Sequence, residues 1–419
     1  MSYLEELIQW LGVNWDPEMT LREWWKILAK SGWSQPLWPL EWYGKGLSRG
    51  EANEVRRTIR EFGAVTGPPG FATGMAGPTL LVHGTDEQKS RFLPGIADGS
   101  DAYCQLFSEP NAGSDLASLQ CRAERDGETW VLNGQKVWTS RGRIANKAML
   151  VARTDFNVAK HAGISYFFIE MDQPGVELRP LKEMTGRSFF NEVFLTDARV
   201  NDSDLIGGEG NGWLVANTNL SFERALSGGG EAASSAEPGA IAGNLGRRAG
   251  DFSSVGSEPS SKKETTSSRL IGLARKLGRN GDDLVRDGVC RLYTLERLIE
   301  LNSRRARDLS EVGQEFPGQP NCAKMAENNA FRLSRELIFS ILGPLGALHS
   351  YGEGDTSIDD DFDIKGLGEL VELGLFASGP PIYGGTDQIQ RNILGERVLG
   401  LPREPSVDKG VPFRDLARN

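Results

Sequence analysis

The two most informative segments of this chain are Leu106-Phe-Ser-Glu-Pro-Asn-Ala-Gly-Ser-Asp115 and Pro381-Ile-Tyr-Gly-Gly-Thr-Asp-Gln-Ile-Gln-Arg391. Both are rich in Gly, Ser, Thr and Pro, whereas the sequence on either side is apolar and periodic, so both are predicted to be loops at the edge of regular structure. Loops of this composition expose backbone N–H groups and hydroxyl groups that can bind phosphates. A third segment, Lys136-Val-Trp-Thr-Ser140, lies between them and is predicted to be a strand.

The periodicity of the apolar residues divides the chain into three regions. Residues 1–100 carry apolar residues at helical spacing. Residues 101–209 have the pattern of several strands, and Asn133-Gly134 is predicted to be a hairpin turn between two of them. Residues 210–419 return to helical spacing, and we expect helices over 215–226, 269–277, 284–307, 323–342 and 388–399.

Composition excludes several classes of function. A chain of 419 residues is too long for one core, so two or three subdomains are expected. The net charge of −10 argues against nucleic-acid binding. No secretory signal and no apolar run of ~20 residues is present, so we expect no membrane span. The four cysteines are scattered and only three histidines occur, which predicts reduced thiols, a cytoplasmic location and no metal site.

The two loops, in this order and with the 136–140 strand between them, resemble the two signatures of the acyl-CoA dehydrogenase family. Members are flavoenzymes that oxidise acyl-CoA thioesters to enoyl-CoA. The resemblance covers essentially the whole chain and implies an α+β fold with an N-terminal helical domain, a central β-barrel-like domain and a C-terminal four-helix bundle. It also implies FAD as cofactor, an electron-transfer flavoprotein as electron acceptor, and a homodimer or homotetramer.

The resemblance assigns residues to the flavin by position. In the first loop, Phe107 and Ser108 would bond to the pyrimidine edge, and Gly113 and Ser114 would lie near the pyrophosphate, with Ser114 also near the substrate. On the strand, Trp138 would pack on the isoalloxazine ring and Ser140 would bond near its N5. In the second loop, Thr386 and Gln388 would contact FAD and Tyr383 would lie beside the acyl chain.

A further set of residues would meet the cofactor of a neighbouring subunit. Gly343 and Gly346 match family positions next to the partner's FAD, although a helix C-cap followed by a turn explains these glycines equally well. The usual Arg-x-x-Phe-Gly element is not recognisable, and Arg275 in Arg275-Lys-Leu-Gly-Arg279 is its expected replacement.

The catalytic base is predicted from what the second loop lacks. In much of the family this loop carries the glutamate that removes the α-proton, but here the position is Gly384. The long-chain and isovaleryl members place the base on an earlier helix in a Glu-Arg pair, and Glu223-Arg224 matches that pair. We therefore expect Glu223 to be the base, with Arg224 in the substrate site and the backbone N–H of Gly384 donating to the thioester carbonyl. The alternative for Glu223 is an ordinary helix-surface residue.

Residues 228–268 depart from the family pattern. They are rich in Gly and Ser and poor in large apolar residues, so we expect a flexible insertion that is dispensable for flavin binding. Two other functions stay open at this point. The chain could be a non-catalytic subunit that completes the site of a homologous partner in a heteromer, or a family oxidase or monooxygenase in which the reduced flavin meets O₂.

Overall fold

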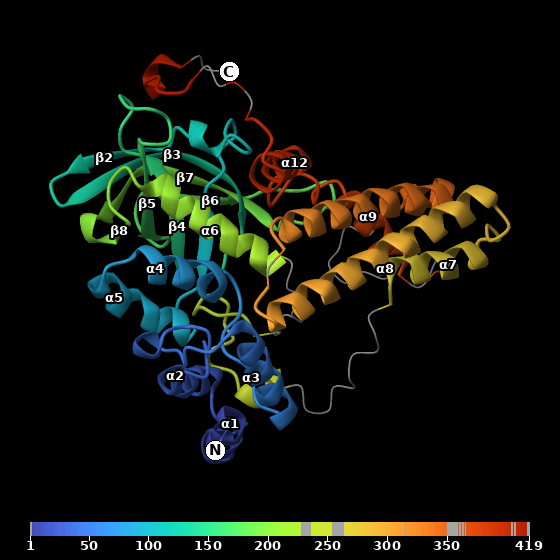
Figure 1. Ribbon diagram of the computed structural model, residues 1–419, viewed down its shortest axis with the longest axis horizontal. Helices are drawn as coiled ribbons and strands as arrows, with labels where there is room; N and C mark the ends of the chain where they lie inside the picture. Colours follow the sequence, from blue (N-terminus) through green and yellow to red (C-terminus); the bar gives the residue numbers. More distant parts are fainter. Residues whose placement is uncertain are drawn as a thin grey trace. The chain divides into compact units, whose positions relative to one another are not determined.

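The computed structural model describes residues 2–227, 236–253, 264–314, 316–349, 359, 362, 364, 366–403, 405 and 408–416 (Figure 1). The chain divides into two compact units. The first comprises Met1–Leu181, Phe189–Ser257 and Ser406–Asn419, and the second comprises Lys182–Ser188 and Glu258–Pro405. The division into domains at 1–100, 101–209 and 210–419 stays a prediction.

The first unit begins with helices whose starts are encoded locally. Ser2, Thr20, Ser48 and Thr85 each form a capping box with the residue three positions later. Trp24 and Trp25 are buried, and their indole N–H groups donate to the carbonyls of Val65 at 2.7 Å and Thr66 at 2.9 Å. The helices are α1 (Tyr3–Asn14), α2 (Leu21–Ser31), α3 (Arg49–Phe62), α4 (Gly77–His83) and α5 (Asp86–Ala97), with a π-turn, η2 (Ala72–Ala76), before α4.

A mixed eight-stranded sheet follows these helices. Its strands are β1 (Tyr103–Leu106), β2 (Arg122–Asp126), β3 (Thr129–Ser140), β4 (Lys147–Arg153), β5 (Ile164–Glu170), β6 (Val176–Pro180), β7 (Phe190–Asn201) and β8 (Leu205–Ile206). The order is β6-β7-β3-β2-β4-β5-β8, and β1 lies parallel to β4. Within the described residues, no pairing joins β6 to β8, so the sheet is open rather than the barrel-like domain expected. The short β8 is paired with β5. Periodicity predicts strands but not their partners, so the open sheet could not be predicted from the sequence.

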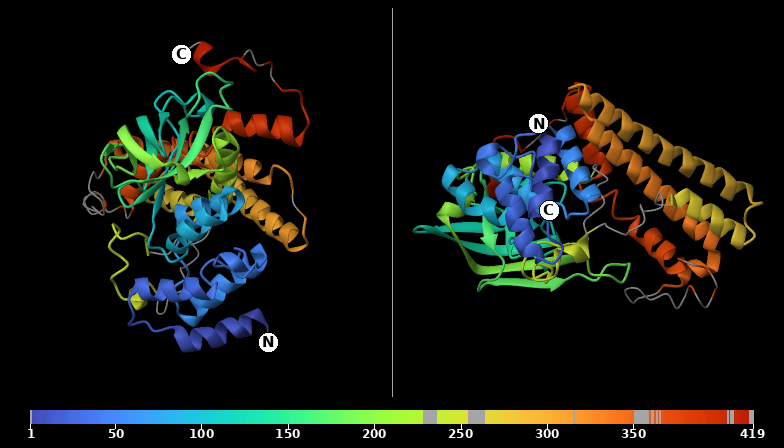
Figure 2. Two further views of the ribbon diagram at one scale, coloured as in Figure 1. Left: turned by 90° about the vertical axis from the view of Figure 1, so that its left-hand side faces the viewer. Right: turned by 90° about the horizontal axis from the view of Figure 1, so that it is seen from below.

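Both faces of β4 and β5 are buried. Met149 and Val151 of β4 face the N-terminal helices, whereas Leu150 and Ala152 between them belong to a second core on the opposite face. The helix α6 (Gly212–Ser227) packs on β4 and β5 from the side of the N-terminal helices. In Figure 2 the blue N-terminal helices lie on one face of the sheet. Burial on both sides explains why β4 and β5 are nearly continuous apolar runs.

The predicted hairpin turn at Asn133-Gly134 is wrong. These residues lie inside the continuous strand β3, and the turn falls instead between β2 and β3. The register of β3 against β7 shifts at Gly134, and a Cβ there would lie 2.8 Å from the Cα of Cys121. Glycine is therefore required for a close backbone approach at a bulge, and this use has the same local sequence as a turn.

Residues 236–253, here called the strap, also differ from the prediction of a flexible insertion. Leu245 and Ala249 are buried in the core of α1–α3, and the backbone N–H groups of Leu21 and Arg22 donate to the carbonyls of Arg247 and Leu245 at 2.8 and 3.0 Å. A few small apolar residues docked by backbone hydrogen bonds are enough to order a Gly/Ser-rich segment. Residues 228–235 and 254–263 lie outside the described residues.

The second unit contains a helical bundle. The helices α7 (Thr266–Lys276), α8 (Asp283–Glu311) and α9 (Gln319–Leu342) lie side by side (Figure 1), and α11 (Leu367–Phe376) packs on α9. Leu270, Leu292, Ile338 and Leu370 form its core, one from each helix. The short α12 (Asp387–Ile393) follows, continued by the π-turn η7 (Leu394–Val398). No helix in the described part of the chain is long and apolar enough to cross a bilayer.

The strap offers a direct test of its docking. Leu245→Ala should lower the free energy of unfolding by about 2–5 kcal/mol, because it leaves a cavity in the core of α1–α3. The matched control is Ile241→Ala in the same strap, whose side chain is 54% exposed. Chemical denaturation measures both variants. Equal, small losses would restore the prediction that this segment does not pack.

Candidate active site

The first motif loop is a compact extension of β1. Glu109 and Ala112 exchange two backbone hydrogen bonds of 3.0 and 3.1 Å, which close a tight turn over Pro110-Asn111. Phe107 is buried and its ring stands edge-on to Tyr166, with the ring centroids 5.9 Å apart. Ser108 accepts a backbone hydrogen bond of 2.9 Å from Val137. The loop and the 136–140 strand, predicted separately from sequence, are therefore brought together.

A buried ion pair joins the first motif loop to the 136–140 strand. The Lys136 ammonium lies 2.8 Å from the Glu109 carboxylate, and the two side chains are 0% and 9% exposed. The ammonium also donates to the Phe107 carbonyl at 3.0 Å. The carboxylate accepts the backbone N–H groups of Gln120 at 2.7 Å and Cys121 at 2.8 Å. Sequence reasoning missed both residues, although a lysine inside an apolar strand is a signal that it needs a buried partner.

Trp138 stands out because it is a large aromatic residue in a strained and exposed position. Its φ of 64° lies in the left-handed region, at a second register shift between Lys136 and Thr139. Its side chain is 59% exposed and contacts Phe190 edge-on, with the ring centroids 5.7 Å apart. Bulges of this kind re-aim a side chain, and strained residues cluster at functional sites. The arrangement therefore fits a platform for a flat ring.

The remaining residues of this unit that were predicted to bind flavin lie around the loop and the bulge. Gly113 and Ser114 are exposed, and a Cβ at Gly113 would meet no atom within 4 Å, so a phosphate-sized group has room there. Ser140 ends β3 opposite Phe190. These residues fit a bound dinucleotide, and their individual contacts with it stay predictions.

The second motif loop belongs to the second unit and is built on consecutive left-handed residues. Gly384 and Gly385 have φ angles of 63° and 87°, which favour glycine. Thr386 caps α12, its hydroxyl accepting the Ile389 N–H at 3.2 Å, and Gln388 is exposed. The Tyr383 ring lies 4.6 Å from the Lys324 ammonium.

One face of α9 holds this loop. Lys324 donates to the Pro380 carbonyl at 2.8 Å, and Gln390, itself bonded by Asn321, donates to the Gly384 carbonyl at 3.1 Å. Asn328 and Arg332 bind the Asp387 carboxylate. Sequence reasoning missed this polar stripe, although its spacing of three, four and four residues follows one helical face and was the available signal: Asn321, Lys324, Asn328 and Arg332.

The stripe and its surroundings shift the ionisation of nearby groups. Burial acts to raise the pKa of Asp387, but the hydrogen bonds from Asn328 and Arg332 outweigh it and the pKa is lowered. Burial raises the pKa of Glu327, and the Lys324 charge opposes that shift. Burial and the Glu327 carboxylate raise the pKa of the Tyr383 phenol, so that ring stays neutral at physiological pH.

Glu223, the predicted base, lies in the first unit on α6. It is half-buried, and its carboxylate accepts a hydrogen bond of 3.2 Å from the Gln105 amide. Gln105 belongs to β1, the strand that leads into the first motif loop. Arg224, the next residue on α6, is also half-buried. Gly384 and Tyr383 belong to the second unit, so the joint site predicted from sequence stays a prediction.

The predicted residues for a neighbouring subunit's cofactor gather at one end of the bundle. Gly343 caps α9 with a φ of 55°, and its N–H donates to the Phe339 carbonyl. Its contact with a neighbouring subunit's cofactor stays a prediction. Gly346 lies in the following turn. Arg275 lies in the last turn of α7, and nearby Arg279 donates to the Ser340 carbonyl at 2.9 Å. This bond brings the Arg275-to-Arg279 segment next to the end of α9.

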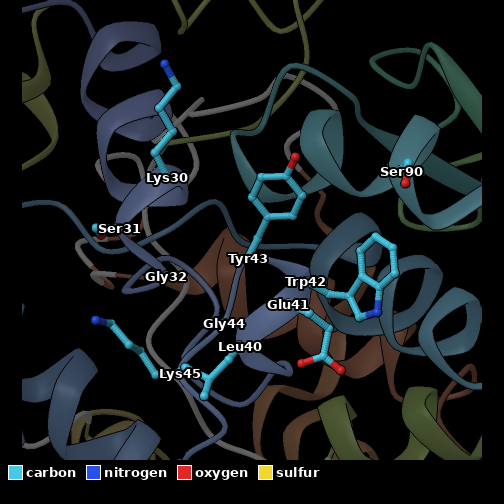
Figure 3. A pocket seen from close by; sticks show the side chains of 10 residues that line it. All are labelled: Lys30, Ser31, Gly32, Leu40, Glu41, Trp42, Tyr43, Gly44, Lys45 and Ser90. Atoms are coloured by element: carbon cyan, nitrogen blue, oxygen red, sulfur yellow. The ribbon is translucent and has the colours of Figure 1, made fainter. Parts of the chain in front are cut away.

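A separate hollow of about 430 Å³ lies between α2 and the segment 40–45. Figure 3 shows the Tyr43 ring in its middle, with the ammonium groups of Lys30 and Lys45 directed away from that ring. The C-terminal end of α2 and Glu41 bring negative charge to the same hollow. Acidic and basic groups both line the hollow, so its charge does not indicate one class of ligand. None of the predicted site residues lines it.

Comparisons with known proteins agree on one family. Residues 3–100 match the family model of the acyl-CoA dehydrogenase N-terminal domain, and residues 104–198 match that of the middle domain. The chain is 37% identical to acyl-CoA dehydrogenase IpdE1 of Mycobacterium tuberculosis (strain ATCC 25618 / H37Rv) over 91% of its own length and 88% of the relative's.

Two solved structures have a similar fold. The Tcur3481-Tcur3483 steroid ACAD matches with a TM-score of 0.66 and 24% identity, covering 96% of this chain and 97% of that chain. The ChsE4-ChsE5 complex from Mycobacterium tuberculosis matches with a TM-score of 0.63 and 25% identity, covering 96% of this chain and 100% of that chain.

The buried ion pair gives a stability test of the site. Lys136→Met leaves the Glu109 carboxylate buried without its cation, so the free energy of unfolding should fall by about 3–5 kcal/mol. Arg57→Met is the control, because its pair with Glu61 has side chains 61% and 69% exposed, and surface pairs of this kind contribute at most about 1 kcal/mol. Chemical denaturation compares the two. Similar losses would show that the pair at 136 and 109 holds nothing in place.

Proposed function

This chain belongs to the acyl-CoA dehydrogenase family, and we propose that it uses FAD to convert an acyl-CoA thioester to the trans-2-enoyl-CoA. The observation that carries the proposal is that Gly384 occupies the position usual for the base, while Glu223 offers a carboxylate on another element. The loop that usually carries the base has a left-handed glycine instead, while a half-buried glutamate on α6 has its carboxylate held by an amide. This is the base placement of the long-chain and isovaleryl members.

The residues of the two loops fit FAD. Phe107, Ser108, Gly113, Ser114, Trp138 and Ser140 would hold it from the first unit, with Thr386 and Gln388 from the second. When bound, FAD supplies a hydride acceptor, the N5 position of its ring, for the β-hydrogen of the substrate. Support for this assignment comes from the exposed indole of Trp138 on its bulge and from the open space at Gly113.

The chain's own residues would then handle the α-proton. Glu223 removes it, and its half-buried carboxylate is held in place by the Gln105 amide, as a positioned general base requires. The Gly384 N–H donates to the thioester carbonyl and stabilises the negative charge that develops there. Tyr383, Arg224 and Ser114 would line the substrate site. Since Gly384 has no side chain, there is room beside the α-carbon for a bulky acyl group, and steroid-derived thioesters belong in the substrate panel.

We further propose an oligomer in which Arg275, Gly343 and Gly346 meet the cofactor of a neighbouring subunit. Each of the two solved structures named above is described by two protein names, Tcur3481-Tcur3483 and ChsE4-ChsE5. This favours a heteromer with a homologous subunit as an alternative to the homodimer or homotetramer. The same observation favours a second candidate function, that of a subunit completing its partner's site. An electron-transfer flavoprotein as acceptor and a cytoplasmic location, which suits four unpaired thiols, complete the proposal.

The mechanism is tested by Glu223→Gln, which keeps the shape of the side chain and removes the proton acceptor. The variant should bind FAD normally and reduce its flavin ~10²–10⁴-fold more slowly when mixed anaerobically with acyl-CoA. Flavin absorbance in a stopped-flow instrument measures this, with a panel of straight, branched and steroid-derived thioesters. An oxygen-saturated arm distinguishes an oxidase from a dehydrogenase.

The control moves the carboxylate within the site. Glu223→Gly combined with Gly384→Glu should recover part of the rate, because a Cβ at 384 would lie 3.6 Å from the Lys324 side chain and fits, although the left-handed backbone strains it. Wild-type flavin reduction by Glu223→Gln would refute its role as the base. Absence of reduction by the wild-type chain with every thioester would favour the partner-subunit function.

The cofactor assignment predicts a distinct effect for Trp138→Ala. The apoprotein should lose less than about 1 kcal/mol of stability because the indole is largely exposed. Affinity for FAD should fall about tenfold because a stacking partner is lost. Fluorescence titration of apoprotein with FAD measures the Kd. Tyr293→Ala on α8, an aromatic residue that is 55% exposed, is the control and should leave the Kd unchanged.

A further inference from the structure

A chain of hydrogen bonds leads from the half-buried Glu223 carboxylate into the core. The Gln105 amide nitrogen lies 3.2 Å from Oε2 of Glu223 and 3.0 Å from Oδ1 of Asn219. An amide nitrogen has two N–H donors, so Gln105 can supply one to each acceptor. The carboxylate and the Asn219 amide are thereby joined through a single side chain.

Asn219 anchors this chain in the core. It is fully buried, and its own amide nitrogen lies 3.1 Å from the Thr79 hydroxyl and 3.1 Å from the Tyr166 hydroxyl. These two contacts orient the amide nitrogen away from Gln105 and leave the Asn219 oxygen facing it. A buried polar network whose members are paired is rigid, because each lost bond exposes a desolvated group.

The helix α6 places Asn219 and Glu223 on the same face. Asn219 and Glu223 are four residues apart on α6, so they lie one turn apart on the same face. The face is turned toward β1, since Gln105 reaches both residues from that strand. A glutamate on a helix has several rotamers, and the hydrogen bond from Gln105 selects one of them.

The position of Gln105 in the sequence connects the Glu223 carboxylate to the first motif loop. Gln105 is paired with Met149 in the sheet and stands two residues before Phe107, where the first motif loop begins. One short strand therefore carries both the residue that holds the carboxylate and the start of the proposed flavin loop. A displacement of β1 would move both together.

We propose that Gln105 is a positioning residue that fixes the Glu223 carboxylate, with Asn219 as its anchor, and that β1 thereby sets the distance between base and flavin. This inference rests on the proposed role of Glu223. Gln105 touches neither substrate nor cofactor in this scheme; it acts through Glu223.

The test compares two variants of similar size. Gln105→Met removes both donors and keeps the shape, whereas Gln105→Glu keeps the shape and adds a second carboxylate beside Glu223. Misplacement of a reacting group by about 1 Å costs up to roughly 10²-fold in rate. We expect anaerobic flavin reduction at saturating acyl-CoA to slow at least tenfold in Gln105→Met and further in Gln105→Glu. The FAD content and the half-saturating acyl-CoA concentration should stay near the wild-type values, because the loss falls on the chemical step.

The matched control is Gln135→Met. Gln135 donates an equivalent bond of 3.1 Å to Glu192 within the β3–β7 pair, so its loss should leave the rate unchanged. Glu223→Gln is measured in parallel. If Glu223→Gln is inactive while both Gln105 variants reduce flavin within about twofold of wild type, Gln105 is not a positioning residue and the proposed function stands. If Glu223→Gln is active, the proposed function fails first. A loss of FAD matching the loss of rate would also overturn the inference, because it would make Gln105 part of the flavin loop's fold.

Discussion

The contact between Lys136 and Glu109 is the constraint on which the first unit's site depends. A buried ammonium group is tolerated only when its charge and its donors are matched, and here the partners are a carboxylate and the Phe107 carbonyl. The same carboxylate accepts backbone N–H groups at Gln120 and Cys121. One ion pair therefore binds backbone groups near the start of the first motif loop and a few residues beyond its end, and ties both to β3, two residues before the exposed Trp138.

The second motif loop is held in the same way by different residues. The carbonyls of Gly384 and Gly385 accept hydrogen bonds from the Gln390 amide, and the Lys324 ammonium donates to the Pro380 carbonyl just before the loop. Asp387 is held by Asn328 and Arg332 of the same helix. In both units, an exposed, glycine-containing loop is thus supported by buried side chains on a rigid element. This arrangement combines a backbone free to approach a ligand closely with a fixed geometry.

Much of the fold could be predicted from sequence because periodicity reports which side of an element is buried. The predicted helix at 215–226 is α6, and the helix predicted over 323–342 is α9. Features that depend on distant contacts could not be predicted. Gly134 has the sequence of a turn but serves a close approach to Cys121, and the strap has the composition of a linker but docks through Leu245 and backbone bonds. α6 belongs to the first unit because its apolar face meets β5.

For the site, the sequence by itself determined the two loops, the strand at 136–140 and the family to which they belong, because these are local patterns of residue type. Only the tertiary structure decided which side chains support them. Neither Gln105 nor Lys136 carries a local signal of its partner, since a hydrogen bond or ion pair between residues far apart in sequence exists only once the chain has brought β1 against α6 and β3 against the first loop. The physical reason is that spacing along a chain encodes the face on which a side chain lies. The partner of a polar side chain depends instead on which groups are buried beside it in the folded chain, where most polar groups form a hydrogen bond.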